Sequence, residues 1–83
     1  MIPLYGFLEG DTQGLLVLAD EADTAAELAR KLQSAAALRV APADGLRVWA
    51  RGQRLEPEVT VASCGLQALD RFDVRRDTEP RRP

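Results

Sequence analysis

Residues 46–74 follow a pattern that allows few folds, because short alternating strands there are separated by turns. Apolar residues alternate with arginine and tryptophan in Leu46–Ala50, and a glycine turn at Arg51-Gly52 leads into a very short strand at residues 53–56. Residues 60–66 read as one tight turn. Residues 70–74 alternate again, with phenylalanine and valine on one side. The pattern predicts a sheet with one buried face.

The N-terminal half predicts two further strands and one helix. Ile2–Leu8 is rich in β-branched, aromatic and aliphatic residues, and the turn cluster at residues 10–14 separates it from the apolar run at residues 15–19. These two strands form a hairpin. Thr24-Ala-Ala-Glu27 is a capping box, so we expect a helix from about residue 25 to about residue 37.

The expected helix has one apolar face and one polar face. The residues expected on the apolar face are Ala25, Leu28, Leu32 and either Ala35 or Ala36. The residues expected to face water are Arg30, Lys31, Gln33 and Ser34. The order strand, strand, helix, strand, short strand, strand resembles the ubiquitin-like β-grasp roll, an α+β fold with a mixed sheet of four to five strands packed on one helix.

Length and composition set the remaining limits on the chain. We expect one domain over residues 1–77 and a disordered tail over residues 78–83, which contain two prolines and no large apolar residue. The 11 basic and 13 acidic residues nearly balance, which argues against nucleic acid as a partner. No stretch approaches the ~20 apolar residues of a membrane span. We expect no signal peptide, because residues 1–6 have no basic n-region. The single cysteine fits a cytoplasmic location.

The chemistry of the chain favours binding over catalysis. Without histidine, the Ser-His-Asp and Cys-His arrangements and most zinc and iron sites are excluded. We interpret Cys64 as a small structural residue and the acidic residues at 20–23 as a helix-capping segment. No glycine-rich phosphate loop occurs. We therefore expect no catalytic, cofactor-binding or metal-binding residue and no small-molecule substrate in this chain.

A sheet with one helix leaves its other face open. If alternation in Leu46–Ala50 turns the aliphatic residues toward the helix, Trp49 points outward, and the same rule turns Tyr5 and Phe7 outward from Ile2–Leu8. Aromatic residues that gather beside arginines are typical of interfaces. The alternative is that a small domain exposes single apolar side chains that bind nothing. The interface predicted on this face comprises Tyr5, Phe7, Arg47, Trp49 and Arg71.

Short segments spread over nearly the whole chain carry a closer resemblance, of which Arg39-Val-Ala-Pro42 is the most specific. The other matching positions are Pro3, Glu9-Gly-Asp11, residues 15–20, Asp23, Ala29, Lys31, Gly45, Arg47-Val48, Thr60, Ala62, Gly65-Leu66 and Asp73-Val74. In these positions the chain resembles the small B protein of toluene monooxygenase systems. That protein is the gamma subunit of the hydroxylase in bacterial multicomponent diiron monooxygenases for aromatics and alkenes. Between Val48 and Thr60 the chain is shorter than in that family, and its basic cluster is reduced.

The resemblance implies a non-catalytic gamma-like subunit that docks on a large subunit, which would hold the two irons. The predicted interface therefore also includes Arg39 and Pro42 in the specific segment. The alternative is a free-standing ubiquitin-like adaptor, for example one associated with type VII secretion. Small ubiquitin-like proteins of those systems carry a turn similar to Cys64-Gly65 and a pair similar to Asp70-Arg71. Conjugation like that of ubiquitin is not expected, because the chain ends in Glu79-Pro-Arg-Arg-Pro83 and lacks the terminal Gly-Gly.

Overall fold

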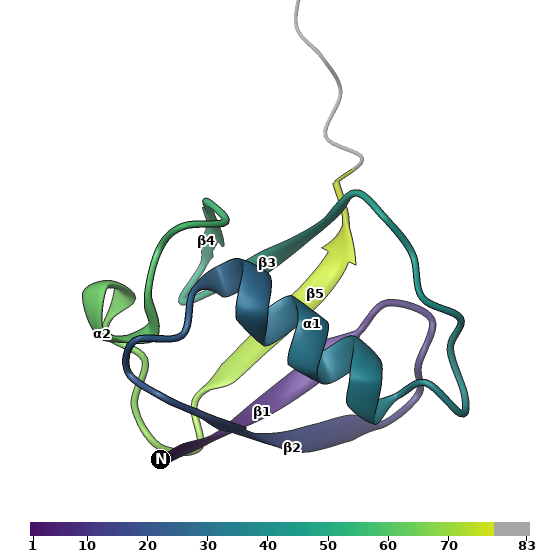
Figure 1. Cartoon of the computed structure of the whole chain (residues 1–83), viewed down its shortest axis with the longest axis horizontal. Helices are drawn as coiled ribbons and strands as arrows, with labels where there is room; N and C mark the ends of the chain where they lie inside the picture. Colours follow the sequence, from purple (N-terminus) through teal and green to yellow (C-terminus); the bar gives the residue numbers. More distant parts are fainter. Residues whose placement is uncertain (78–83) are drawn as a thin grey trace, which may run out of the picture.

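A computed structural model describes residues 1–77, in which one helix lies across one face of a five-stranded mixed sheet (Figure 1). The elements in chain order are β1 (Ile2–Leu8), β2 (Gly14–Ala19), α1 (Ala25–Ala35), β3 (Leu46–Ala50), β4 (Gln53–Leu55), α2 (Val61–Cys64) and β5 (Arg71–Arg76). The predicted α+β roll is confirmed. The tail predicted at residues 78–83 lies outside the described residues.

Strands from the two ends of the described chain meet in the middle of the sheet. The strand order is β2-β1-β5-β3-β4, and β1 and β5 run parallel while the other neighbours run antiparallel. Leu8 lies opposite Val74 in the β1–β5 pair, and Val74 lies opposite Val48 in the β5–β3 pair. This register places the last strand between the first and the third.

The helix begins at the predicted capping box. The Glu27 backbone N–H donates to Thr24 Oγ1 at 3.2 Å, and the Thr24 N–H donates to Glu27 Oε1 at 2.8 Å. The helix ends at Ala35, two residues before the expected end, because the chain turns after Ala36, whose carbonyl accepts from the Arg39 N–H. Of the two alanines left open by the sequence, Ala36 is buried and Ala35 is exposed.

The core lies between α1 and one face of the sheet. No polar or charged residue among residues 1–77 belongs to this core. The core leaves no room for a side chain at Gly6, because a Cβ at this position would lie 2.7 Å from the Phe72 ring and 2.9 Å from Leu32. The buried residues of the sheet are Leu4, Leu8, Val17, Ala19, Val48, Ala50, Leu55, Phe72 and Val74, and those of α1 are Ala25, Leu28, Ala29 and Leu32.

The polar face of α1 differs from the sequence expectation at two positions. Lys31 forms a 2.6 Å ion pair with Asp23 and donates to the Leu18 carbonyl at 3.0 Å. Gln33 Oε1 accepts from the Ala43 N–H at 2.9 Å. Both residues were expected to face water, but both are half-buried, because Asp23 and β2 lie against Lys31 and the loop after α1 lies against Gln33. No helix within residues 1–77 is long and apolar enough to cross a membrane.

Candidate protein-binding surface

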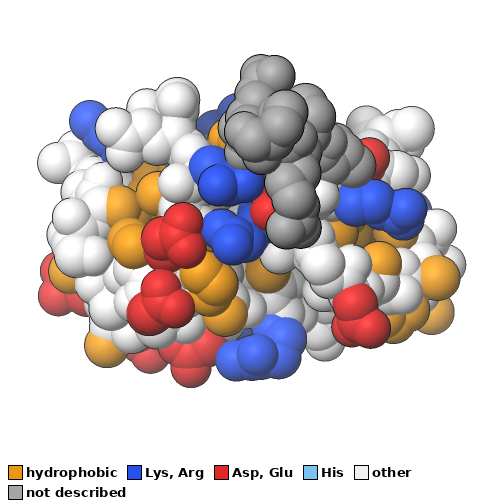
Figure 2. Space-filling model, turned by 90° about the horizontal axis from the view of Figure 1, so that it is seen from above, with side chains coloured by type: hydrophobic (Ala, Val, Ile, Leu, Met, Phe, Trp, Pro, Cys, Tyr) orange, Lys and Arg blue, Asp and Glu red, His pale blue; other side chains and the backbone are white. Residues whose placement is uncertain are grey.

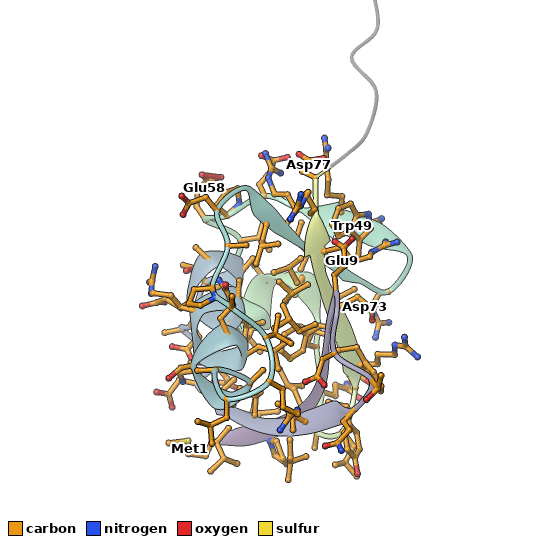
Figure 3. The ribbon with its side chains drawn as sticks, turned by 90° about the vertical axis from the view of Figure 1, so that its right-hand side faces the viewer. Met1, Glu9, Trp49, Glu58, Asp73 and Asp77 are labelled. Carbon is orange, nitrogen blue, oxygen red and sulfur yellow. The ribbon has the colours of Figure 1, made fainter. Side chains whose placement is uncertain are left out.

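The face of the sheet turned away from α1 is here called the open face. Successive residues of a strand point to opposite sides, so each buried strand residue leaves its neighbour on this face. Figure 3 shows Trp49 and Asp73 projecting from the sheet on the side opposite α1. The open face consists of Pro3, Tyr5, Phe7, Leu16, Leu18, Arg47, Trp49, Arg54, Arg71, Asp73 and Arg75.

One half of the open face, over β1 and β2, is apolar. Tyr5 lies opposite Leu16 and Pro3 lies opposite Leu18. The exposed fractions are 44% for Tyr5, 55% for Leu16 and 54% for Leu18. The sequence prediction missed both leucines, because the apolar run at residues 15–19 carries no alternation that separates inward from outward residues.

The other half of the open face, over β5, β3 and β4, is charged and largely self-neutralised. Arg71 binds Asp73 through two hydrogen bonds of 2.8 and 3.2 Å, and this contact raises the pKa of Arg71. Arg54 pairs with Asp77 at 3.0 Å, while Arg47 lies 3.8 Å from the same carboxylate. Figure 2, a view onto the end of the domain where β5 ends, shows basic and acidic side chains interspersed with hydrophobic ones.

Three of the four aromatic side chains, those of Tyr5, Phe7 and Trp49, share the open face, as predicted, but β5 divides them into two groups. Tyr5 and Phe7 lie on one side of β5 and Trp49 on the other. Arginines of β5 cover two of these rings, those of Phe7 and Trp49. The Arg71 guanidinium carbon lies 4.0 Å from the centroid of the Phe7 ring, and that of Arg75 lies 4.2 Å from the centroid of the Trp49 ring.

A shallow hollow on the open face lies between β5 and the turn that joins β3 to β4. Arg51 and Gly52 make this turn with φ angles of 53° and 79°, a left-handed pair that suits a two-residue hairpin. The residues that line the hollow are Trp49, Ala50, Arg51, Gly52, Asp70, Arg71, Asp73 and Arg75. Arg75 was not among the predicted interface residues, although alternation with Phe72 and Val74 already placed it outward.

Arg39 and Pro42, also predicted as interface residues, lie apart from the open face, in the loop that follows α1. Arg39 binds Asp11 through hydrogen bonds of 3.1 and 2.9 Å, and the Asp11 side chain is only 2% exposed. The ion pair lowers the pKa of Asp11 and raises that of Arg39. It joins this loop to the β1–β2 loop at one end of the domain, where Figure 1 shows the two loops side by side.

The remaining candidate positions of the sequence have structural roles. Asp23 accepts from the Asp20 N–H at 2.9 Å and pairs with Lys31, which lowers the pKa of Asp23. Cys64 packs against the core, with Sγ 3.5 Å from the Val61 carbonyl. Within residues 1–77, no three histidine, cysteine or acidic side chains are grouped in a way that could hold a metal ion. The surface therefore offers exposed apolar area and arginine-covered aromatic rings, which are suited to contact with another protein.

Comparison with known proteins matches this chain to a family and to a fold. The family model described as toluene-4-monooxygenase system protein B matches residues 1–75. A chain in a structure described as the toluene 4-monooxygenase HD complex with the inhibitor 4-bromobenzoate is 28% identical, with a TM-score of 0.84. That match covers 92% of this chain and 98% of that chain.

More distant structures confirm the fold alone. Ubiquitin from Caldiarchaeum subterraneum is 20% identical, with a TM-score of 0.73 over 93% of this chain and 94% of that chain. A chain in a crystal structure of ATBAG1 in complex with HSP70 is 9% identical, with a TM-score of 0.76 over 95% of this chain and 42% of that chain. No curated protein sequence matches this chain.

Proposed function

Because the chain belongs to the family of toluene-4-monooxygenase system protein B, we propose that it is the small, gamma-like subunit of a bacterial diiron monooxygenase hydroxylase. In this role it is not itself catalytic and docks on the large subunit. The observation that carries the proposal is the family match over residues 1–75. The likeness to a chain of the toluene 4-monooxygenase complex, which spans 98% of that chain, supports it.

The open face supports a docking role. Its apolar half exposes Tyr5, Leu16 and Leu18, and its charged half carries Trp49 beneath an arginine. Aromatic residues and arginine are enriched where proteins bind each other, and neighbouring exposed apolar side chains mark such surfaces. The loop with Arg39 and Pro42 stays a prediction for a second contact, since its arginine is engaged by Asp11 within the domain.

The proposal places the metal and the substrate in the partner. The large subunit would bind the two irons with carboxylates and histidines from a helical bundle, the arrangement typical of diiron proteins. This chain contains no histidine and would bind neither iron nor hydrocarbon. The proposal also places the complex in the cytoplasm, which the single free cysteine supports.

Co-expression with the large subunit tests this function. We expect the two chains to purify together at equal stoichiometry, and the small chain purified alone to carry no iron and to oxidise no hydrocarbon. A variant with Tyr5, Phe7 and Trp49 all replaced by alanine should lose the association. Stoichiometric binding by that variant would exclude the open face, whereas no association of the wild type with any diiron subunit would favour a free-standing ubiquitin-like adaptor.

A further inference from the structure

Two arginines of β5 cover aromatic rings of the neighbouring strands on the open face, and the two arginine–aromatic pairs differ in one respect. Arg71 covers the Phe7 ring, and its guanidinium is bound at the same time by both oxygens of Asp73. Arg75 covers the Trp49 ring at a similar distance, but it forms no ion pair with any carboxylate in residues 1–77. The charge of Arg71 is therefore neutralised within the domain, whereas no carboxylate in residues 1–77 neutralises that of Arg75.

The other arginines that line the hollow or lie near it already have carboxylate partners. Arg51 lies 3.5 Å from Asp70, and Arg47 lies 3.5 Å from Glu56. Among the three arginines of the hollow, Arg75 is thus the one whose charge no described carboxylate neutralises. The three arginines and two aspartates that line the hollow leave one net positive charge there, beside the indole of Trp49.

The geometry of Arg75 leaves it able to bind a second group. The 4.2 Å between the Arg75 guanidinium carbon and the Trp49 centroid suits stacking of the two flat groups, an arrangement that leaves the N–H donors at the edge of the guanidinium plane. The ring restrains the long side chain, so less conformational entropy is lost when a ligand binds. A carboxylate can then accept two parallel hydrogen bonds, as Asp73 does from Arg71.

Resting on the proposed docking function, we infer that the large subunit places an aspartate or glutamate side chain in this hollow, bound by Arg75 over Trp49. The partner carboxylate takes the position toward Arg75 that Asp73 takes toward Arg71. The contact fixes the orientation of the small subunit, because a bidentate arginine–carboxylate pair tolerates little rotation. The apolar half of the open face supplies contact area beside it.

The test measures the affinity of the full-length chain for the purified large subunit. Arg75→Gln should weaken binding about ten- to a hundredfold, the usual effect of losing a hydrogen-bonded charge. Arg75→Lys keeps the charge but loses the bidentate geometry, so its affinity should lie between that of the wild type and that of Arg75→Gln. Arg30→Gln is the matched control, since Arg30 is exposed on α1 and forms no ion pair within residues 1–77, and it should bind as the wild type does.

Two further readouts separate a specific pair from a general charge effect. The affinity of the wild type should fall as salt is raised, and the salt dependence should be weaker in Arg75→Gln. Arg75→Glu should bind poorly, and a partner variant in which one surface carboxylate is replaced by arginine should restore its binding. The melting temperature of Arg75→Gln should stay near that of the wild type, because the side chain has no ion pair in the domain to lose.

The outcomes distinguish failure of this inference from failure of the proposed function. If the wild type binds and Arg75→Gln binds equally well, the inference is overturned and the docking function stands. Equal weakening of binding by Arg30→Gln and Arg75→Gln also overturns it. So does a failure to restore binding of Arg75→Glu by replacing any surface carboxylate of the partner with arginine. If the wild type does not bind the large subunit, the proposed function fails and the inference fails with it.

Discussion

The covered face and the open face of the sheet are built from alternate residues of the same strands, yet they have opposite properties. On the covered face, Leu4 and Phe72 are fully buried against α1. On the open face, their neighbours Tyr5 and Arg71 lie at the surface, and Arg71 is held by a ring and a carboxylate. Stability and recognition thus occupy separate residues, and substitutions on one face should leave the property of the other largely intact.

The largest expected effect is a loss of stability when a substitution creates a cavity on the covered face. Leu32 is 0% exposed, and Leu32→Ala should lower the free energy of unfolding by about 2–5 kcal/mol. Urea titration followed by circular dichroism would measure it. Arg30→Ala, two residues away on the exposed side of α1, serves as the control and should change little. Equal, small losses in both variants would show that the helix does not pack as described.

Two glycines allow the same substitution to be compared on both faces. A Cβ at Gly6 would collide with Phe72 and Leu32 in the core, whereas one at Gly14 would lie 2.6 Å from the Phe7 ring on the open face. Gly6→Ala should lower the free energy of unfolding by about 1–3 kcal/mol, because packed core atoms cannot move away. Gly14→Ala should cost less, because Phe7 can rotate toward solvent. Thermal melts of the two variants would contradict this if Gly14→Ala were the less stable protein.

An open-face substitution should produce the reverse pattern. Trp49→Ala removes the ring beneath Arg75 and should weaken association with the large subunit by about 1–3 kcal/mol, as for an interface anchor. Its effect on unfolding should be smaller than that of Leu32→Ala. Calorimetric titration of the complex, with a denaturation curve of the free chain, provides both numbers. A variant that unfolds easily yet binds normally would break the division between the faces.

The smallest effect concerns Asp11, which belongs to neither face. Its pKa is below the ordinary 3.8 because Arg39 binds the ionised form, so this pair stabilises the fold fully above pH 3.8. The contribution is lost as the pH falls from 3.8 through the lower pKa of the folded state. Asp11→Asn should therefore be less stable than the wild type at pH 7, and the difference should shrink in acid. Asp44→Asn, at an exposed loop aspartate with no ion pair in the described chain, should show no such change.

Much of the fold could be predicted because its signals are local. The capping box at Thr24 and Glu27 determines where α1 begins, and alternation in β3 and β5 assigns residues to a face. The end of α1 was less certain because the alanines at 35–37 carry no stop signal. The two outward leucines of β2 could not be identified, since every residue from 15 to 19 is apolar.

The candidate surface could be predicted only in part, because its key contacts join distant segments. Alternation places Phe7, Trp49, Arg71 and Arg75 outward one strand at a time. Which arginine covers which ring depends on β5 lying between β1 and β3, and the spacing of residues within a strand does not contain that order. The Asp11–Arg39 pair, 28 positions apart, is hidden in the sequence for the same reason.

The central position of β5 also determines when the domain can fold during its synthesis. A ribosome synthesises a chain from its N-terminus at about 5–20 residues per second, and domains fold as units. Until residues 71–76 emerge, β1 and β3 lack the strand that lies between them, and Phe72 and Val74 are missing from the core. Until then, the nascent hairpin of β1 and β2 lacks its partner strand β5 and cannot complete the sheet. Native structure therefore forms only after β5 has left the exit tunnel.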